Sequence, residues 1–105
     1  MPKTVTEWVL SCHQAAREKG FWEKERNVGE ILMLVVSELG EAIEAHRTGA
    51  FGIAKKDTFE DEITDAVIRL FDLCGGLKID LERQMEWKIA FNKNFDKRNF
   101  AKKLL

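Results

Sequence analysis

The segment ILMLVVSELGEAIEA, residues 31–45, decides the fold of this 105-residue chain. Its apolar residues recur every three to four positions, which is the period of an amphipathic helix and not of a strand. Glu38 and Glu41 stand three residues apart, so a helix presents both carboxylates on one face. The expected apolar arc, with the two carboxylates at its edge, consists of Leu32, Val35, Val36, Leu39, Ala42 and Ile43.

The segment EDEITDAVIRL, residues 60–70, repeats this layout. Glu62 and Asp65 are again three residues apart at the edge of an apolar arc, with Arg69 on the same stripe. Asp72 lies one turn beyond this edge and is expected to be solvated. The expected arc of this second helix consists of Phe59, Ile63, Ala66, Val67, Leu70, Leu73 and Cys74.

Capping residues and glycines predict where the helices begin and end. Four helices are expected, with starts at Thr4, Asn27, Asp57 and Asp80 and ends near Lys19, Arg47, Gly76 and Asn94. Their short connections favour an all-α, four-helix up-and-down bundle formed by one domain, residues 1–105. The tail, residues 99–105, is expected to fray or to continue the last helix.

Composition narrows the class of protein. The formal charge of −1 argues against binding of a nucleic-acid polymer through bulk charge. No stretch has the length of a membrane span or the pattern of a signal peptide, so no membrane association is expected. Cys12 and Cys74 form no CxxC pair, and we interpret them as reduced residues of a cytoplasmic protein.

Four carboxylates at the border of a helical core repel one another unless a cation neutralises them. Oxygen ligands favour Mg²⁺, with Mn²⁺ as a substitute, and we expect Glu38, Glu41, Glu62 and Asp65 to be the ligands. A di-iron site is disfavoured because no Glu-x-x-His pair is present. The alternative without a metal pairs these carboxylates with Arg69, Arg47 or Lys55 as ordinary helix-flank charges.

The two acidic couplets, about twenty residues apart on adjacent helices, resemble the all-α nucleoside triphosphate pyrophosphohydrolases of the MazG-like superfamily. SELGEAIEA and EDEITDAVIRL are similar to the two central helices of that family, and the resemblance covers most of the chain. The family pattern usually has a glutamate where this chain has Ser37. Within the superfamily the chain most resembles the short, single-domain branch that includes dCTP pyrophosphatases.

This resemblance implies Mg²⁺-dependent hydrolysis of an NTP or dNTP to the monophosphate and pyrophosphate, as in clearance of unwanted nucleotides. Glu38 and Glu41 are the candidate catalytic residues, and position alone makes Glu41 the first candidate to position or deprotonate the attacking water. The resemblance also implies a base pocket formed by His13, Trp22 and Asn92. The phosphates would be held by Lys88, with Lys93 or Arg98 in support. Thr48 replaces an aromatic residue expected in the base pocket.

Ile68 and Phe71 lie off the expected arc, which indicates a second buried face and a homodimer or homotetramer. Relatives often assemble in this way, so residues of the first and last helices can serve a neighbouring subunit's site. Two other functions stay open. One is a helical interaction module without catalysis, and the other is a family member that acts on a phosphoribosyl or other non-nucleotide diphosphate.

Overall fold

The computed structural model describes residues 2–94, and these residues form four α-helices and no strand. The helices are α1 (Val5–Glu18), α2 (Val28–Thr48), α3 (Phe59–Gly76) and α4 (Leu81–Lys93). The all-α class is therefore confirmed, with helix ends within one or two residues of those predicted. The predicted tail at 99–105 lies outside the described residues.

Three of the four predicted helix starts are confirmed as N-caps. In each, a side-chain oxygen accepts a hydrogen bond from the amide three residues later, which satisfies one of the unpaired amides of the first turn. These caps are Thr4, Asn27 and Asp80. At Thr4 the capping box is complete, because the Glu7 carboxylate also accepts from the Thr4 amide.

The prediction that Asp57 caps α3 is wrong by one residue. Asp57 has a φ of +62°, in the left-handed region, whereas an N-cap needs an extended backbone. Thr58 has that extended backbone, with φ −93° and ψ 167°, and its hydroxyl accepts from the Asp61 amide. The same hydroxyl donates to the carbonyls of Gly52 and Lys55, which ties the preceding loop to the start of α3.

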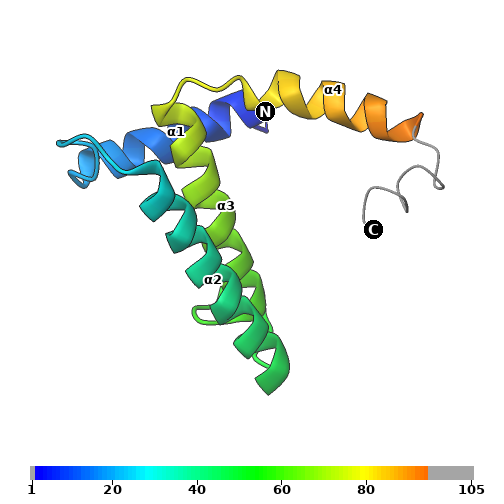
Figure 1. Ribbon diagram of the computed structural model, residues 1–105. Helices are drawn as coiled ribbons and strands as arrows, with labels where there is room; N and C mark the ends of the chain where they lie inside the picture. Colours follow the sequence, from blue (N-terminus) through cyan, green and yellow to red (C-terminus); the bar gives the residue numbers. More distant parts are fainter. Residues whose placement is uncertain (1, 95–105) are drawn as a thin grey trace.

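The helices form an antiparallel α2–α3 pair with α1 lying across one end of it (Figure 1). α1 packs on α3, whereas α4 contacts α1 and extends away from the α2–α3 pair (Figure 1). Within the described residues, one chain therefore has the predicted helices without closing them into a complete four-helix bundle.

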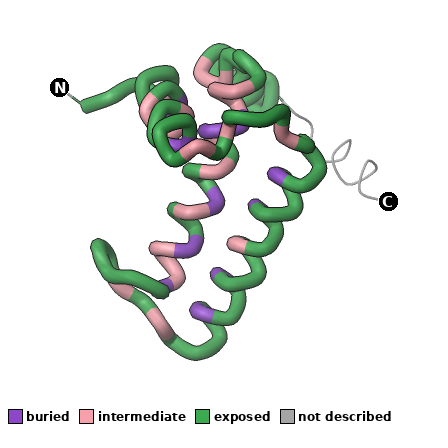
Figure 2. The backbone as a smooth tube through the Cα atoms, turned by 90° about the vertical axis from the view of Figure 1, so that its left-hand side faces the viewer, coloured by how far each residue is buried: buried purple, intermediate pink, exposed green. Residues whose placement is uncertain are grey.

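Half of the apolar residues that are buried in α2 and α3 are alanines. The buried residues of α2 follow one line on the side that faces α3 (Figure 2). The buried apolar residues of the two helices are Ile31, Val35, Ala42, Ala45, Ala66 and Leu73. Small residues allow the two helix backbones to approach closely, so larger side chains on either flank remain outside the interface.

The predicted apolar arcs are therefore only partly buried. On α2, Val35 and Ala42 are buried as predicted, but a stripe of four residues from the same arc is exposed: Leu32, Val36, Leu39 and Ile43. On α3, three residues of the predicted arc are also exposed: Ile63, Val67 and Leu70. Burial of the complete arcs was thus a wrong prediction for a single chain.

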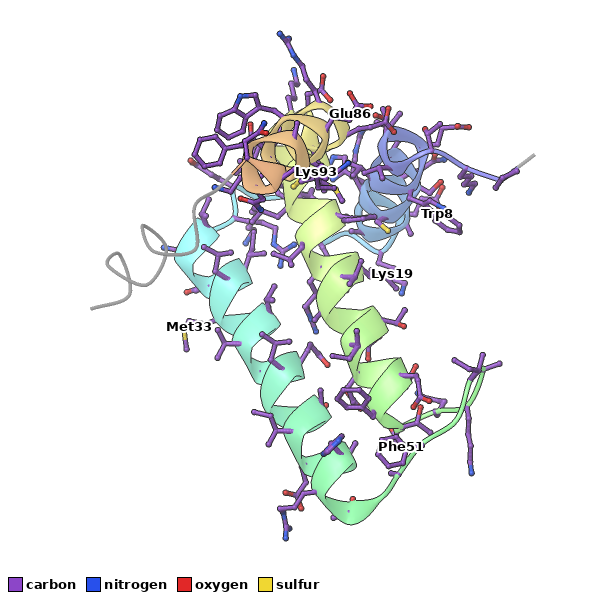
Figure 3. All side chains as sticks on the ribbon, turned by 90° about the vertical axis from the view of Figure 1, so that its right-hand side faces the viewer. Trp8, Lys19, Met33, Phe51, Glu86 and Lys93 are labelled. Atoms are coloured by element: carbon purple, nitrogen blue, oxygen red, sulfur yellow. The ribbon has the colours of Figure 1, made fainter. Side chains whose placement is uncertain are left out.

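The two exposed stripes form one surface, which we call the apolar face (Leu32, Val36, Leu39, Ile43, Ile63, Val67 and Leu70). Each stripe lies about 100° further around its helix than the residues buried between the helices. Because the helices are antiparallel, the same rotation brings both stripes to the same side of the pair. Ile68, predicted to be exposed, is 44% exposed but lies on the other side, and Met33 projects away from α3 (Figure 3).

Cys12 and Cys74 are both free thiols of intermediate burial, and burial raises the pKa of each. This agrees with the predicted absence of a disulfide. Among the described residues, no helix combines the length and the apolar character that a membrane crossing requires.

Candidate functional site

Three of the four predicted metal ligands meet between α2 and α3. Glu38, Glu41 and Glu62 each place a carboxylate oxygen within 4.8 Å of the other two. Glu38 and Glu41 share a face of α2 because they are three residues apart, and Glu62 lies in the first turn of α3. The antiparallel pairing of the helices brings this turn beside the middle of α2. We call this group the glutamate cluster.

Glu62 is the most unusual member of the glutamate cluster. It is only 5% exposed, and its Oε2 atom is buried without a hydrogen-bond partner. Burial first, and then hydrogen bonding with and repulsion by Glu41 and Glu38, raise the pKa of Glu62 from its ordinary 4.5 to about 7. The raised pKa means that Glu62 retains a proton more readily than an ordinary glutamate does when no cation is bound.

A buried carboxylate oxygen without a donor is expensive in free energy unless a proton or a cation is nearby. The glutamate cluster offers only oxygen atoms, which suits a hard divalent ion. Its residues therefore fit Mg²⁺ or Mn²⁺ in both donor type and spacing. The fit rests on the unpaired Oε2 atom of Glu62, because exposed acidic groups alone are common on helices.

Asp65, the fourth predicted ligand, lies one turn along α3 and is half-buried. Burial, followed by the charges of Asp61 and Glu38, raises the pKa of Asp65, and Arg69 and Lys56 partly oppose this effect. Asp65 is not among the three mutually close carboxylates of the glutamate cluster. It lies near enough to Glu38 to interact electrostatically with it.

The predicted alternative of simple salt bridging applies to one member of the cluster. The Arg69 guanidinium donates to Oε1 of Glu38, with N–O distances of 3.1 and 3.2 Å. This pair orients Glu38 and neutralises one charge. The two other predicted cations, Arg47 and Lys55, do not pair with the cluster, and Arg47 instead forms a bidentate pair with Glu44.

A second group of carboxylates adjoins the glutamate cluster, and the sequence analysis did not identify it. Asp57, Asp61 and Glu62 also place carboxylate oxygens within 4.8 Å of one another. Glu62 thus belongs to both groups. The signal in the sequence was the four-residue spacing of Asp57 and Asp61 at a helix start, where only Asp57 had a predicted role, that of the cap.

His13 and Trp22 lie together, as the predicted base pocket requires, but around a buried carboxylate. Their rings are 5.1 Å apart in an edge-to-face arrangement. Trp22 Nε1 donates to Oδ1 of Asp72 over 2.8 Å, and His13 Nδ1 lies 2.9 Å from the same oxygen. Arg26 donates to Oδ2 over 3.3 Å. We call these four residues the Asp72 network.

The prediction that Asp72 is solvated is therefore wrong, because this residue is only 6% exposed. The reason lies in Gly75 and Gly76, which the sequence analysis used only as a helix end. A Cβ atom at Gly75 would overlap the His13 side chain, and one at Gly76 would overlap the Trp22 ring. The two glycines thus let α1 and the following turn cover Asp72.

A cleft of about 330 Å³ connects the Asp72 network with the acidic residues of α2 and α3. Its charged lining includes Glu38, Asp65 and Asp72 together with three basic side chains, Lys19, Arg26 and Arg69. Phe21 contributes an aromatic ring, and Ile31 and Ile68 contribute apolar walls. Its volume lies at the lower end of the range for small-molecule sites, roughly 300–1,000 Å³.

The predicted site residues of α4 do not join this cleft within one chain. Lys88 and Asn92 are exposed, and the Lys88 ammonium lies 5.0 Å from the Phe91 ring and 5.9 Å from the Trp87 ring. Lys93 lies at the opposite end of the molecule from Phe51 in the loop before α3 (Figure 3). Arg98 lies outside the described residues.

Comparison with protein-family models, with curated proteins and with solved structures finds no significant match for this chain.

Proposed function

We propose that this chain is a Mg²⁺-dependent pyrophosphohydrolase of nucleoside triphosphates, of the MazG-like type. The observation that carries the proposal is the buried, unpaired Oε2 atom of Glu62, a residue whose carboxylate lies beside those of Glu38 and Glu41. The ion would be held by the glutamate cluster, with Asp65 nearby. When bound, the ion neutralises the carboxylates, polarises a phosphate oxygen and lowers the pKa of a bound water.

The cleft beside the cluster suits a nucleotide because it combines opposite charges with an aromatic ring. Lys19 and Arg26 supply positive charge for phosphate oxygens, and Phe21 supplies a surface on which a base can stack. These three residues perform, within one chain, the tasks that the sequence analysis assigned to residues of α4 and to Trp22. The Trp22 N–H is already bound to Asp72, so Trp22 supports the wall of the cleft.

Glu41 is the cluster member best placed to act on water, because it is exposed whereas Glu62 is buried. Glu38 is held by Arg69 and so keeps a fixed orientation. In the proposed reaction Glu41 orients or deprotonates the water that attacks the triphosphate, and the products are a monophosphate and pyrophosphate. The assignment of Glu41 rests on its position in the cluster and on its exposure.

We further propose that the active form is a homodimer or homotetramer. The apolar face is the support for this, because a monomer rarely exposes so many adjacent large apolar side chains. Packing of two apolar faces would complete a bundle of four helices from the α2–α3 pairs of two copies. Such an assembly gives α4 of one copy a route to the cleft of another, which is where Lys88, Asn92 and Lys93 would act.

The test is pyrophosphate release from a panel of NTPs and dNTPs, with Mg²⁺ and with EDTA. We expect metal-dependent release that is lost in Glu62→Gln and Glu41→Gln. Glu44→Gln is the matched control, because Glu44 lies on α2 outside the cluster and its carboxylate pairs with Arg47. Undiminished release by the Glu62→Gln variant would overturn the proposal.

A second candidate function is a helical interaction module without catalysis, and the apolar face is the observation that favours it. This candidate predicts no thermal stabilisation by Mg²⁺ and no loss of stability when the carboxylates are neutralised. A melting curve of the wild-type protein with and without Mg²⁺ separates the two candidates, because only a metal site produces the shift.

A further inference from the structure

Arg26 differs from the two other basic side chains of the cleft in the way it is held. Arg69 contacts the Glu38 carboxylate through two of its nitrogens, and Lys19 is exposed to water. The Arg26 side chain, in contrast, is only 19% exposed although it lines the cleft. Arg26 is therefore a basic group that the fold withdraws from water and keeps at the wall of the proposed site.

Two aromatic rings and one carboxylate hold the Arg26 guanidinium. Its central carbon lies 5.2 Å from the centroid of the Trp22 ring and 5.9 Å from that of the Phe21 ring, which is within the range of a cation–π attraction. One terminal nitrogen donates to Oδ2 of Asp72 over 3.3 Å. Because a partly buried cation is unfavourable without a counter-charge, the Asp72 carboxylate keeps the guanidinium beside these rings.

The Asp72 carboxylate is fixed without the help of Arg26. Trp22 Nε1 lies 2.8 Å and His13 Nδ1 lies 2.9 Å from the same oxygen, Oδ1. The other oxygen, Oδ2, is the one that accepts from Arg26. The Asp72 side chain is 9% exposed, so it has little freedom to turn away. Oδ2 is thus a rigid acceptor that determines where the guanidinium sits.

Most of the hydrogen-bonding capacity of Arg26 is unused within the protein. A guanidinium has five N–H donors, and among residues 2–94 its one hydrogen bond is the bond to Asp72. The remaining donors suit two oxygens of a phosphate group, which a guanidinium binds as a planar fork. A side chain that is already ordered loses less conformational freedom when a ligand arrives, and this raises affinity.

We propose that Asp72 is a positioning residue, which holds Arg26 at the cleft ready to bind phosphate oxygens of the ligand. The inference rests on the proposed function, because it concerns how the same cleft binds a phosphate anhydride. It makes a prediction of unusual sign. The negative charge of Asp72 repels an anion, so repulsion alone predicts tighter binding when Asp72 is neutralised. Loss of positioning predicts weaker binding.

The test is isothermal titration calorimetry of the full-length protein with inorganic pyrophosphate in the presence of Mg²⁺. Asp72→Asn keeps the shape of the side chain and an oxygen that accepts from Trp22, and circular dichroism checks that the variant is folded. We expect Asp72→Asn to weaken pyrophosphate binding by about tenfold, since Arg26 then has to be ordered during binding. In the hydrolysis assay it should raise KM more than it lowers kcat.

A double-mutant cycle shows whether Asp72 acts through Arg26. Arg26→Gln should also weaken binding, and Asp72→Asn should cause no further loss in the Arg26→Gln protein. Glu44→Gln is the control and should bind like the wild-type protein. An equal loss from Asp72→Asn in both backgrounds, or binding by Asp72→Asn as tight as that of the wild-type protein, would overturn the inference and leave the proposed function intact.

A measurement on the wild-type protein keeps the inference testable if Asp72→Asn does not fold. Relaxation of the Arg26 Nε–H group in nuclear magnetic resonance should show an ordered side chain before pyrophosphate is added. An order parameter below about 0.6 in the free protein would contradict positioning by Asp72. A folded wild-type protein that neither binds pyrophosphate nor releases it from any nucleotide would overturn both the inference and the proposed function.

Discussion

Replacement of Asp72 by alanine tests the most important difference between the sequence analysis and the structure. If Asp72 were solvated, the substitution would have little effect on stability. In the structure its side chain is 9% exposed and binds Trp22, His13 and Arg26, whose partly buried groups would lose their acceptor. We therefore expect a large loss of stability in Asp72→Ala.

The magnitude follows from the three contacts. A hydrogen bond to a charged group contributes roughly 1.5–3 kcal/mol, and removal of one partner of a buried ion pair costs roughly 3–5 kcal/mol. Arg26 is 19% exposed and 3.3 Å away, so it regains water more easily than Trp22 does. We expect the free energy of unfolding to fall by about 4 kcal/mol, which corresponds to a decrease in Tm of roughly 15–30 °C.

The assay is chemical and thermal unfolding at one fixed protein concentration, since assembly would make Tm depend on concentration. Trp22→Phe removes the indole N–H that donates to Asp72. The loss of unfolding free energy caused by Trp22→Phe should therefore be about 1.5 kcal/mol smaller in the Asp72→Ala protein than in the wild-type protein. Glu44→Ala is the control, because its exposed pair with Arg47 should leave Tm almost unchanged. A loss below about 1 kcal/mol in Asp72→Ala would refute the assignment of a buried network.

Three further predictions concern other parts of the molecule. Gly76→Ala should lower the free energy of unfolding by roughly 1–3 kcal/mol, because its Cβ would overlap the Trp22 ring. Gly40→Ala has open space around the new Cβ and should raise the free energy of unfolding by about 0.5–1 kcal/mol. Equal effects of the two substitutions in urea unfolding would contradict this prediction. The pKa of Glu62 is raised from 4.5 to about 7, so its contribution to stability is complete below pH 4.5 and is lost as the pH rises through 7. The Tm of the metal-free wild-type protein should accordingly fall over this window relative to that of Glu62→Gln, and a rise would contradict the assignment. Val36 is 53% exposed on the apolar face, so Val36→Glu should dissociate the proposed oligomer and leave the helices intact. Analytical ultracentrifugation measures the dissociation, and circular dichroism measures the helix content. An unchanged sedimentation coefficient would count against the oligomer.

The helices could be predicted because their signals are local. A cap such as Thr4 or Asn27 acts on an amide only three residues away, so its effect is legible in the sequence. The side of each helix that becomes buried is not a local property. On α2 apolar residues lie on more than one side of the helix, and only the side that includes Ile31, Val35, Ala42 and Ala45 is buried.

In the candidate site, too, local spacing was predictable from the sequence and burial was not. The spacing of Glu38 and Glu41 predicted a shared face, and the structure places Glu62 against that face. Asp57 was predicted to cap α3, but its φ of +62° excludes the extended backbone of a cap, and Thr58 takes that position instead. The sequence did not predict that the Trp22 ring packs against Gly76, where no Cβ blocks it. Glycine is common at helix ends for conformational reasons, so Gly76 gave no separate signal of this contact.

The sequence alone determined that this protein is helical, where its helices begin and end, and which carboxylates share a face, because these properties depend on neighbours within one turn. Only the tertiary structure decided that Glu62 is buried with an unpaired oxygen and that Asp72 is enclosed by three donors. It also decided which apolar residues remain on the surface. Burial depends on how helices distant in sequence approach each other, and that approach is set by the small residues at their contacts.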